Sequence, residues 1–185
     1  MIEFRFHGRG GQGAVVGAKI FATALFSEGK FVQAFPFFGV ERRGAPVTAF
    51  VRVNDKKINL RSQIYEPDHL VVMDHHLLNN TSTFKGFKKN GFVLINTRFD
   101  VKELSKNPQF LGCKLATVDA SKIAVAEHLG SHSSPIVNTA IIGALCKITG
   151  LCSIDSVCNA IKKGAPINPL GNARAAQRAF EEVVI

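Results

Sequence analysis

The chain has 185 residues, of which 46% are hydrophobic and 20% charged, as in an ordinary soluble protein with room for one domain and a core. It has no apolar signal segment at its start and no apolar run long enough to cross a bilayer, so we expect a cytoplasmic protein without membrane contact. The formal net charge of +9 would suit nucleic acid, but basic residues occur at most in pairs and no nucleic-acid module signature is present. We therefore expect no nucleic-acid partner; a solvated face, an acidic partner subunit or a polyphosphate ligand explains this charge at least as well.

The first predicted element is a strand, a glycine turn and a helix. Residues 2–7 alternate between apolar and polar, and a helix-compatible segment runs from Ala14 to Phe26. Between them lie Gly8, Arg9, Gly10, Gly11, Gln12 and Gly13, which fit the spacing G-x-G-x-x-G. Such glycines let a phosphate approach the N-terminus of the helix, where N–H groups and the dipole favour anions. They equally suit a turn that only lets the helix pack on the strand, and both interpretations stay open.

The second predicted strand, residues 31–35, argues against NAD binding. A dinucleotide-binding unit places an acidic residue near the end of this strand to hold the ribose. Here that position offers Gln33, Ala34, Phe35 and then Pro36. A stand-alone nucleotide-dependent dehydrogenase is therefore only the second interpretation.

The loop from Pro36 to Pro46 combines aromatic residues, glycines and adjacent opposite charges. Exposed aromatic residues cost solubility, so a loop of this composition indicates a binding role. The alternative is that its phenylalanines fold back onto the core. We favour a subunit interface or ligand-facing loop, with the candidate residues Phe37, Phe38, Gly39, Glu41, Arg42 and Arg43.

The rest of the chain alternates further strands and helices. Residues 47–53 and 56–60 predict a β-hairpin about the turn Asn54-Asp55, and residues 69–73, 92–96 and 114–118 predict strands. Helices are expected over 119–129, over 136–148 after the start signal Ser133-Ser134-Pro135, and over 153–163 and 172–183. Together these predict one α/β domain over residues 1–185, a Rossmann-like three-layer domain with a mainly parallel sheet plus an inserted β-hairpin.

Neither a metal site nor a catalytic residue is expected. Asp74, His75 and His76 follow a strand, but neighbouring side chains diverge, so we expect a helix-capping Asp74 with surface histidines. The cysteines form no C-x-x-C pair, which makes an iron–sulfur cluster on this chain improbable and buried thiols the expectation. No nucleophile motif or paired carboxylate motif is present.

Four segments in combination point to a family. They are the glycine loop 8–13, the loop Phe35–Gly44, the apolar helix segment Val137–Leu145 and the tail Asn172–Ala176. In this order they resemble the gamma subunit of pyruvate and related 2-oxoacid:ferredoxin oxidoreductases, over essentially the whole chain. The first two segments are the specific part. Ala45, where the family usually has a second glycine or another small residue, is a mild departure.

The resemblance implies a supporting role in a larger enzyme. Such enzymes decarboxylate a 2-oxoacid, most commonly pyruvate, to acyl-coenzyme A and pass electrons to ferredoxin or flavodoxin. Thiamine diphosphate, Mg and iron–sulfur clusters would lie mainly on the alpha, beta and delta subunits, and the isolated gamma chain would be inactive. For this chain we expect Gly8–Gly13 either to bind a coenzyme A phosphate, with Arg9 adding charge, or to pack against another subunit. We expect Glu41, Arg42 and Arg43 at the subunit interface.

Overall fold

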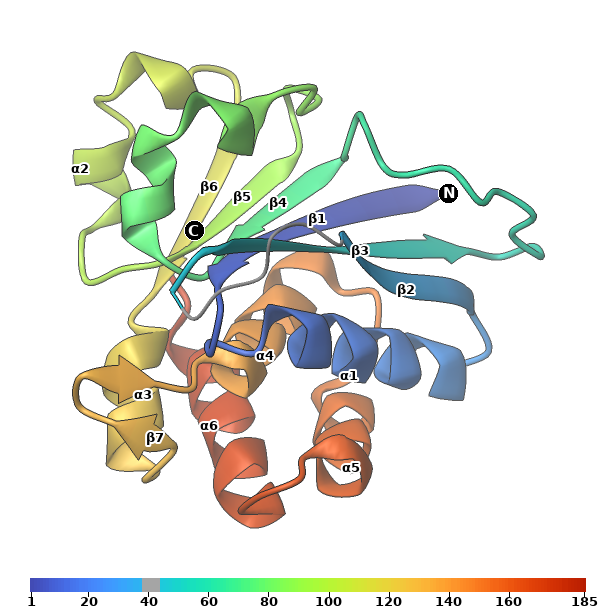
Figure 1. Cartoon of the computed structure of the whole chain (residues 1–185), viewed down its shortest axis with the longest axis vertical. Coiled ribbons are helices and arrows are strands. Elements are labelled where there is room, and N and C mark those ends of the chain that lie inside the picture. The colour runs from blue at the N-terminus through green and yellow to red at the C-terminus, as the bar shows by residue number, and fades with distance from the viewer. Residues whose placement is uncertain (38–43) are drawn as a thin grey trace.

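The computed structural model describes residues 1–37 and 44–185, and a six-stranded sheet runs through its middle (Figure 1). The strands lie in the order β2-β3-β1-β4-β5-β6. β1, β4, β5 and β6 are parallel, whereas β3 is antiparallel to both β1 and β2. The bounds are Ile2–Arg9 (β1), Phe31–Phe37 (β2), Pro46–Asn54 (β3), His69–Val72 (β4), Phe92–Asn96 (β5) and Lys114–Val118 (β6).

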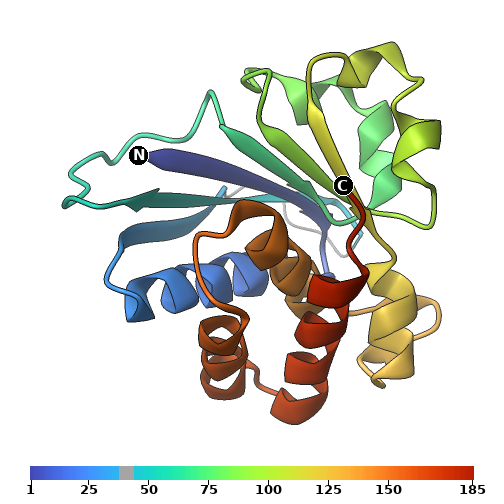
Figure 2. The ribbon, with the colours of Figure 1, turned by 180° about the vertical axis from the view of Figure 1, so that it is seen from behind.

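Helices cover both faces of the sheet, which confirms the three-layer α/β prediction (Figures 1 and 2). One face carries α1 (Ala14–Ser27), α3 (Ala120–Ala126), α4 (Asn138–Thr149), α5 (Ile154–Gly164) and α6 (Pro169–Glu182). Over β4–β6, the other face carries η1 (His75–Asn79), η2 (Thr81–Phe84), α2 (Val101–Leu104) and η3 (Pro108–Phe110). No helix in the described part of the chain has the length and apolar character needed to cross a membrane.

The strands β4, β5 and β6 are largely apolar because alternate side chains enter two separate cores. In β4, Val71 joins the large core under α1, α4 and α6, whereas Leu70 and Val72 join a smaller core with Leu77 and Phe110. A strand buried on both faces reads as a continuous apolar run. This explains why β4, β5 and β6 are recognisable in the sequence.

The predicted hairpin is wrong in its second strand. Residues 56–60 form no strand; β3 instead pairs with β2 on one side and with β1 on the other. Because both edges of β3 are used, no hydrogen-bonding edge is left for the segment that follows it. The side-chain amide of Gln33 instead donates to the carbonyls of Ile58 and Leu60, at 3.3 and 3.0 Å. The inserted hairpin is β2–β3.

The predicted start of the buried helix is also wrong. Ser134–Pro135 forms β8, which pairs with β7 (Gly130–Ser131), and α4 begins only at Asn138. The helix itself is buried as expected. Gly143 packs directly against α6, since a Cβ there would overlap the backbone carbonyl of Ala176.

Between β1 and β4, the connecting helices change from one face of the sheet to the other. The connection from β1 to β2 runs through α1 on one face, whereas those from β4 to β5 and from β5 to β6 run through short helices on the other face (Figure 1). In open α/β sheets, ligands bind outside the carboxyl ends of the strands at such a reversal. The glycine loop and Asp74 lie at this position.

Candidate functional site

The glycine loop connects the end of β1 to α1 through two residues that L side chains fit poorly. Gly11 and Gly13 have φ values of 103° and 77°. Gly13 is the N-cap of α1, and no side chain within residues 1–37 or 44–185 caps this end of the helix. The N–H groups of its first turn therefore have no side-chain acceptor in the described chain, which suits an anion.

Gly13 also packs tightly against another helix. A Cβ at Gly13 would lie 2.5 Å from Nδ2 of Asn138, the first residue of α4. The same Nδ2 lies 3.4 Å from the Gly13 carbonyl oxygen, to which it donates. By contrast, nothing lies within 4 Å of a Cβ placed at Gly11. Packing therefore accounts for Gly13, whereas Gly11 lies beside open space.

The two motifs on which the resemblance rests meet in space. The Gly10 amide donates to the Ala45 carbonyl at 2.9 Å, and the Gly44 amide donates to the Gly10 carbonyl at 3.2 Å. Nη1 of Arg9 also donates to the Gly44 carbonyl, at 3.2 Å. Of the candidate loop residues, Phe37 ends β2 with 49% of its surface exposed. Phe38, Gly39, Glu41, Arg42 and Arg43 lie outside the described residues.

Arg9 is held by an acidic partner that the sequence did not reveal. Its Nε lies 2.7 Å from Oδ2 of Asp74, and Nε2 of Gln12 lies 3.4 Å from the same oxygen. Oε1 of Gln12 in turn accepts from the Arg9 amide at 2.8 Å. The position of Asp74 at the end of β4 was the available signal, because ends of parallel strands meet at one edge of the sheet.

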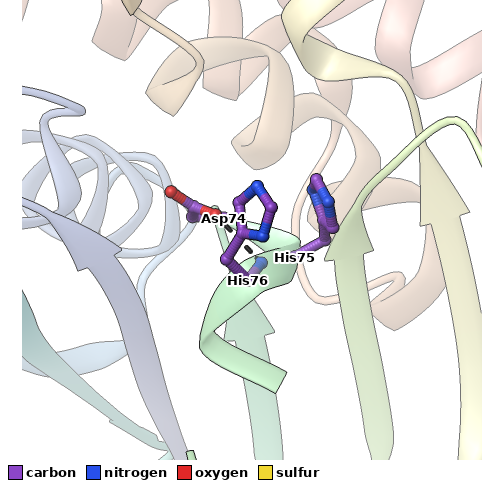
Figure 3. A group of neighbouring side chains, drawn as sticks. All are labelled: Asp74, His75 and His76. Carbon is purple, nitrogen blue, oxygen red and sulfur yellow. Dashed lines mark hydrogen bonds between the residues drawn. The ribbon is translucent and has the colours of Figure 1, made fainter. Parts of the chain in front are cut away.

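Asp74, His75 and His76 lie together at the start of η1 (Figure 3). Oδ1 of Asp74 accepts from the His76 amide at 3.0 Å, which confirms the predicted cap. The expectation that these side chains diverge is wrong: one ligand atom of each lies within 4.8 Å of the others, and the imidazole centroids are 4.0 Å apart. Burial, and then neighbouring His76, lower the pKa of His75. A cation here would have to compete with Arg9 for the carboxylate of Asp74.

A cavity of about 330 Å³ opens beside this cluster, at the carboxyl ends of β4, β5 and β6. Its polar lining includes Gln12 from the glycine loop, Asn96 at the end of β5 and Ser121 in α3. Asn96 is fixed by donating to the Met73 carbonyl and to Oγ of Ser121, at 2.9 and 3.0 Å. The sequence patterns singled out neither Asn96 nor Ser121 as a site residue.

The cysteines are thiols, and three of them are buried as expected: Cys146, Cys152 and Cys158. Cys113 is half-buried, and burial raises the pKa of its thiol. The thiol of Cys146 donates to the Cys152 carbonyl at 2.9 Å, so a main-chain oxygen holds it.

Comparisons with known proteins agree over nearly the whole chain. A family model described as "Pyruvate ferredoxin/flavodoxin oxidoreductase" matches residues 3–182. The pyruvate/ketoisovalerate oxidoreductases common subunit gamma of Thermococcus kodakarensis is 54% identical, covering 100% of this chain and 98% of that protein. The crystal structure of pyruvate oxidoreductase subunit PORC from Thermotoga maritima, 36% identical, superposes with a TM-score of 0.83 over 99% of this chain and 97% of that one.

A more distant solved structure shares the fold alone. The 2-oxoglutarate:ferredoxin oxidoreductase of Magnetococcus marinus, with 2-oxoglutarate, coenzyme A and succinyl-CoA bound, is 18% identical and has a TM-score of 0.73. The match covers 97% of this chain but 30% of that chain.

Proposed function

This chain belongs to the pyruvate ferredoxin/flavodoxin oxidoreductase family, as a gamma subunit, and from that premise we propose how it serves the reaction. The complete enzyme oxidatively decarboxylates a 2-oxoacid, pyruvate in our proposal, in the cytoplasm and forms acyl-coenzyme A and CO2. Complexes of this family use thiamine diphosphate and iron–sulfur clusters. We place these, with Mg, mainly on alpha, beta and delta subunits, with ferredoxin or flavodoxin receiving the electrons through the complex. Residues 1–185 act as one gamma-type domain that is inactive alone.

The observation that carries the proposal is the meeting of the two motif loops at the carboxyl end of β1. Gly10 joins Gly44 and Ala45 through main-chain hydrogen bonds, so the glycine loop and the described end of the second loop lie side by side. Such a position suits a subunit of a multi-chain enzyme, because ligand sites occur preferentially where domains meet.

We assign a coenzyme A phosphate to the glycine loop, residues Gly8, Arg9, Gly10, Gly11, Gln12 and Gly13. The support is the open space beside Gly11 and the absence of a described side-chain cap on α1. Because Arg9 is paired with Asp74, the main-chain N–H groups would supply most of the binding. The competing interpretation, in which the loop only packs against another subunit, draws its support from the contact between Gly13 and Asn138.

A matched pair of glycine variants tests this assignment. Gly11 and Gly29 both have positive φ and open space around a Cβ, but Gly29 lies at the other end of α1. In the complete complex, we expect Gly11→Val to raise the KM for coenzyme A about tenfold or more and Gly29→Val to leave it unchanged. Isothermal titration of the isolated chain with coenzyme A should give heat that Gly11→Val abolishes. Heat at the buffer background, together with unchanged coenzyme A kinetics in Gly11→Val, would exclude the assignment.

The alternative, a stand-alone nucleotide-dependent dehydrogenase, finds less support. A dinucleotide-binding unit places its second strand directly beside the first, with the ribose-binding acid at its end. Here β3 lies between β1 and β2, and β2 ends in Phe35, Pro36 and Phe37. Titration with NADH, followed by its fluorescence, distinguishes the two, because only the dehydrogenase should bind it.

A further inference from the structure

A second cavity, of about 460 Å³, lies on the side of β1 and β3 that faces away from α1. Arg5 and His7 of β1 and Thr48 and Phe50 of β3 point away from the large core. Segment 55–68 connects the end of β3 to the start of β4 (Figure 1). The walls are largely apolar and include Phe37, Phe50, Ile64 and Leu77. A cavity of this size suits a small organic molecule.

A buried guanidinium faces this cavity. Arg5 is only 7% exposed. Its Nη2 donates to the carbonyls of Thr83 and Lys85, at 3.0 and 2.7 Å, and its Nε donates to Nε2 of His7 at 3.0 Å. Within residues 1–37 and 44–185, no atom accepts a hydrogen bond from Nη1, and no carboxylate forms an ion pair with Arg5. No buried side-chain nitrogen or oxygen of the described chain lacks a partner, so Nη1 is open to the cavity. A guanidinium so little exposed, without a carboxylate among the described residues, favours an anionic partner at this position.

The neighbouring Arg52 provides an internal comparison on the same face of the sheet. Arg52 is 1% exposed, and its Nε lies 2.6 Å from Oε1 of Glu3. The register pairs Glu3 with Arg52 across β1 and β3, whereas Arg5 faces Phe50. The strand pairing therefore places a carboxylate opposite Arg52 but none opposite Arg5.

His7 contributes a second donor to the cavity lining. Because its Nε2 accepts from Arg5, the proton of the neutral imidazole is on Nδ1. Lys85 adds a further cation to the lining, in which Glu66 is the one carboxylate among the described residues. The lining therefore combines two cationic side chains with one anionic one and an apolar wall.

We propose that this cavity binds a small organic carboxylate with an apolar body, its carboxylate on Nη1 of Arg5 and its body against Phe50 and Ile64. Arginine binds carboxylates through strong charge-assisted hydrogen bonds, and the apolar wall favours an aliphatic or aromatic body over a bare inorganic anion. This cavity adjoins the glycine loop at Gly8, but His7 and Phe50 place it on the side of the sheet away from α1.

The test uses 4-fluorophenylacetate as the probe, observed by fluorine NMR in the presence of the purified multi-subunit complex. We expect the fluorine signal of the acid to broaden and the signal of the uncharged analogue 2-(4-fluorophenyl)ethanol to stay sharp. Arg5→Gln should reduce the affinity at least tenfold. No broadening by the wild-type complex at millimolar probe, or equal broadening of the acid and the alcohol, would overturn the proposal.

A second variant guards against misfolding of Arg5→Gln. Lys85 has an exposed side chain and holds Arg5 only through its backbone carbonyl, so Lys85→Glu preserves that contact. We expect Lys85→Glu to weaken probe binding several-fold and the control Lys106→Glu, beyond α2, to have no effect. Equal binding by Lys85→Glu and Lys106→Glu would count against the site. This experiment does not measure coenzyme A kinetics. A negative result would therefore exclude the carboxylate site without bearing on the glycine-loop assignment.

Discussion

At the scale of single residues, His7 is the titratable group that the fold changes most clearly. Burial, and then the neighbouring Arg5 guanidinium, lower the pKa of His7 to about 3. Charging this imidazole would place a second cation against a buried guanidinium, at 3.0 Å between Nε2 and Nε. The neutral imidazole instead accepts from Arg5 and keeps it oriented.

The stability of the folded chain should therefore depend on pH through His7. His7 becomes protonated below its ordinary pKa of about 6.5 in the unfolded chain, but only below about pH 3 in the folded chain. The free energy of unfolding therefore decreases as the pH falls through this range. Between pH 6.5 and 4.5 we expect the wild type to lose about 2–3 kcal/mol more in its free energy of unfolding than His7→Gln. Urea denaturation measures this, with His132→Gln, an exposed site, as the control. Parallel pH profiles for wild type and His7→Gln would contradict it.

At the scale of elements, the contact between α4 and α6 depends on a missing side chain. Gly143 lies against the backbone of Ala176, so the two helices approach more closely there than any larger residue permits. α4 is buried and carries Asn138 to the glycine loop, while Oγ1 of Thr139 donates to Oδ1 of Asn172 in α6 at 2.8 Å. The packing of these helices thus sets the position of the residue that contacts Gly13.

Replacing Gly143 with alanine should destabilise the chain because the neighbouring atoms are backbone and cannot move aside. We expect a loss of roughly 1–3 kcal/mol or more in the free energy of unfolding. Gly164→Ala is the matched control: it also lies in a helix, a Cβ there would be 3.6 Å from Ile20, and removing a glycine should raise stability by about 0.4–1 kcal/mol. Thermal denaturation of both variants checks the opposite signs, and equal shifts in Tm would refute this account of the helix contact.

At the scale of the whole molecule, the surface formed by the two motif loops is where we expect partner subunits. The described ends of the second loop, Phe37 and Gly44, flank residues Glu41, Arg42 and Arg43, and Gly44 is joined to the glycine loop. The net charge of +9 would favour an acidic partner surface, since complementary charge guides association.

Charge reversal at Arg42 and Arg43 should therefore weaken assembly. With both replaced by glutamate, we expect a tagged gamma chain to recover roughly tenfold less of the catalytic subunits, because like charges across an interface are repulsive. The control reverses Lys56 and Lys57, an exposed pair beyond the other end of β3. Normal recovery of the complex together with normal turnover in the Arg42/Arg43 variant would contradict the interface assignment.

The sequence predicted the elements whose signals are local. The strand, glycine turn and helix at the start, the strands 69–73, 92–96 and 114–118, and the cap at Asp74 all follow from neighbouring residues. The order of the sheet does not, because β3 reaches its place between β1 and β2 by pairing that is specified across the fold.

The site was predictable only in part for the same reason. Gly10 and Gly44 could be recognised as motif residues, but not as hydrogen-bonded neighbours. The ion pair of Arg9 with Asp74 joins positions 65 residues apart. That no described carboxylate pairs with Arg5 becomes visible only when the register places Glu3 opposite Arg52. Such pairings depend on which strands lie side by side.

The link between Gly10 and residues 44 and 45 is made by main-chain atoms, and this has a consequence for sequence variation in the family. Its two hydrogen bonds do not depend on the side chains of the second loop. Substitutions between Phe37 and Gly44 therefore leave this anchoring intact, provided that Gly44 keeps its φ of 81°. Charge changes in this stretch should therefore alter what the surface binds without releasing its anchor at Gly10.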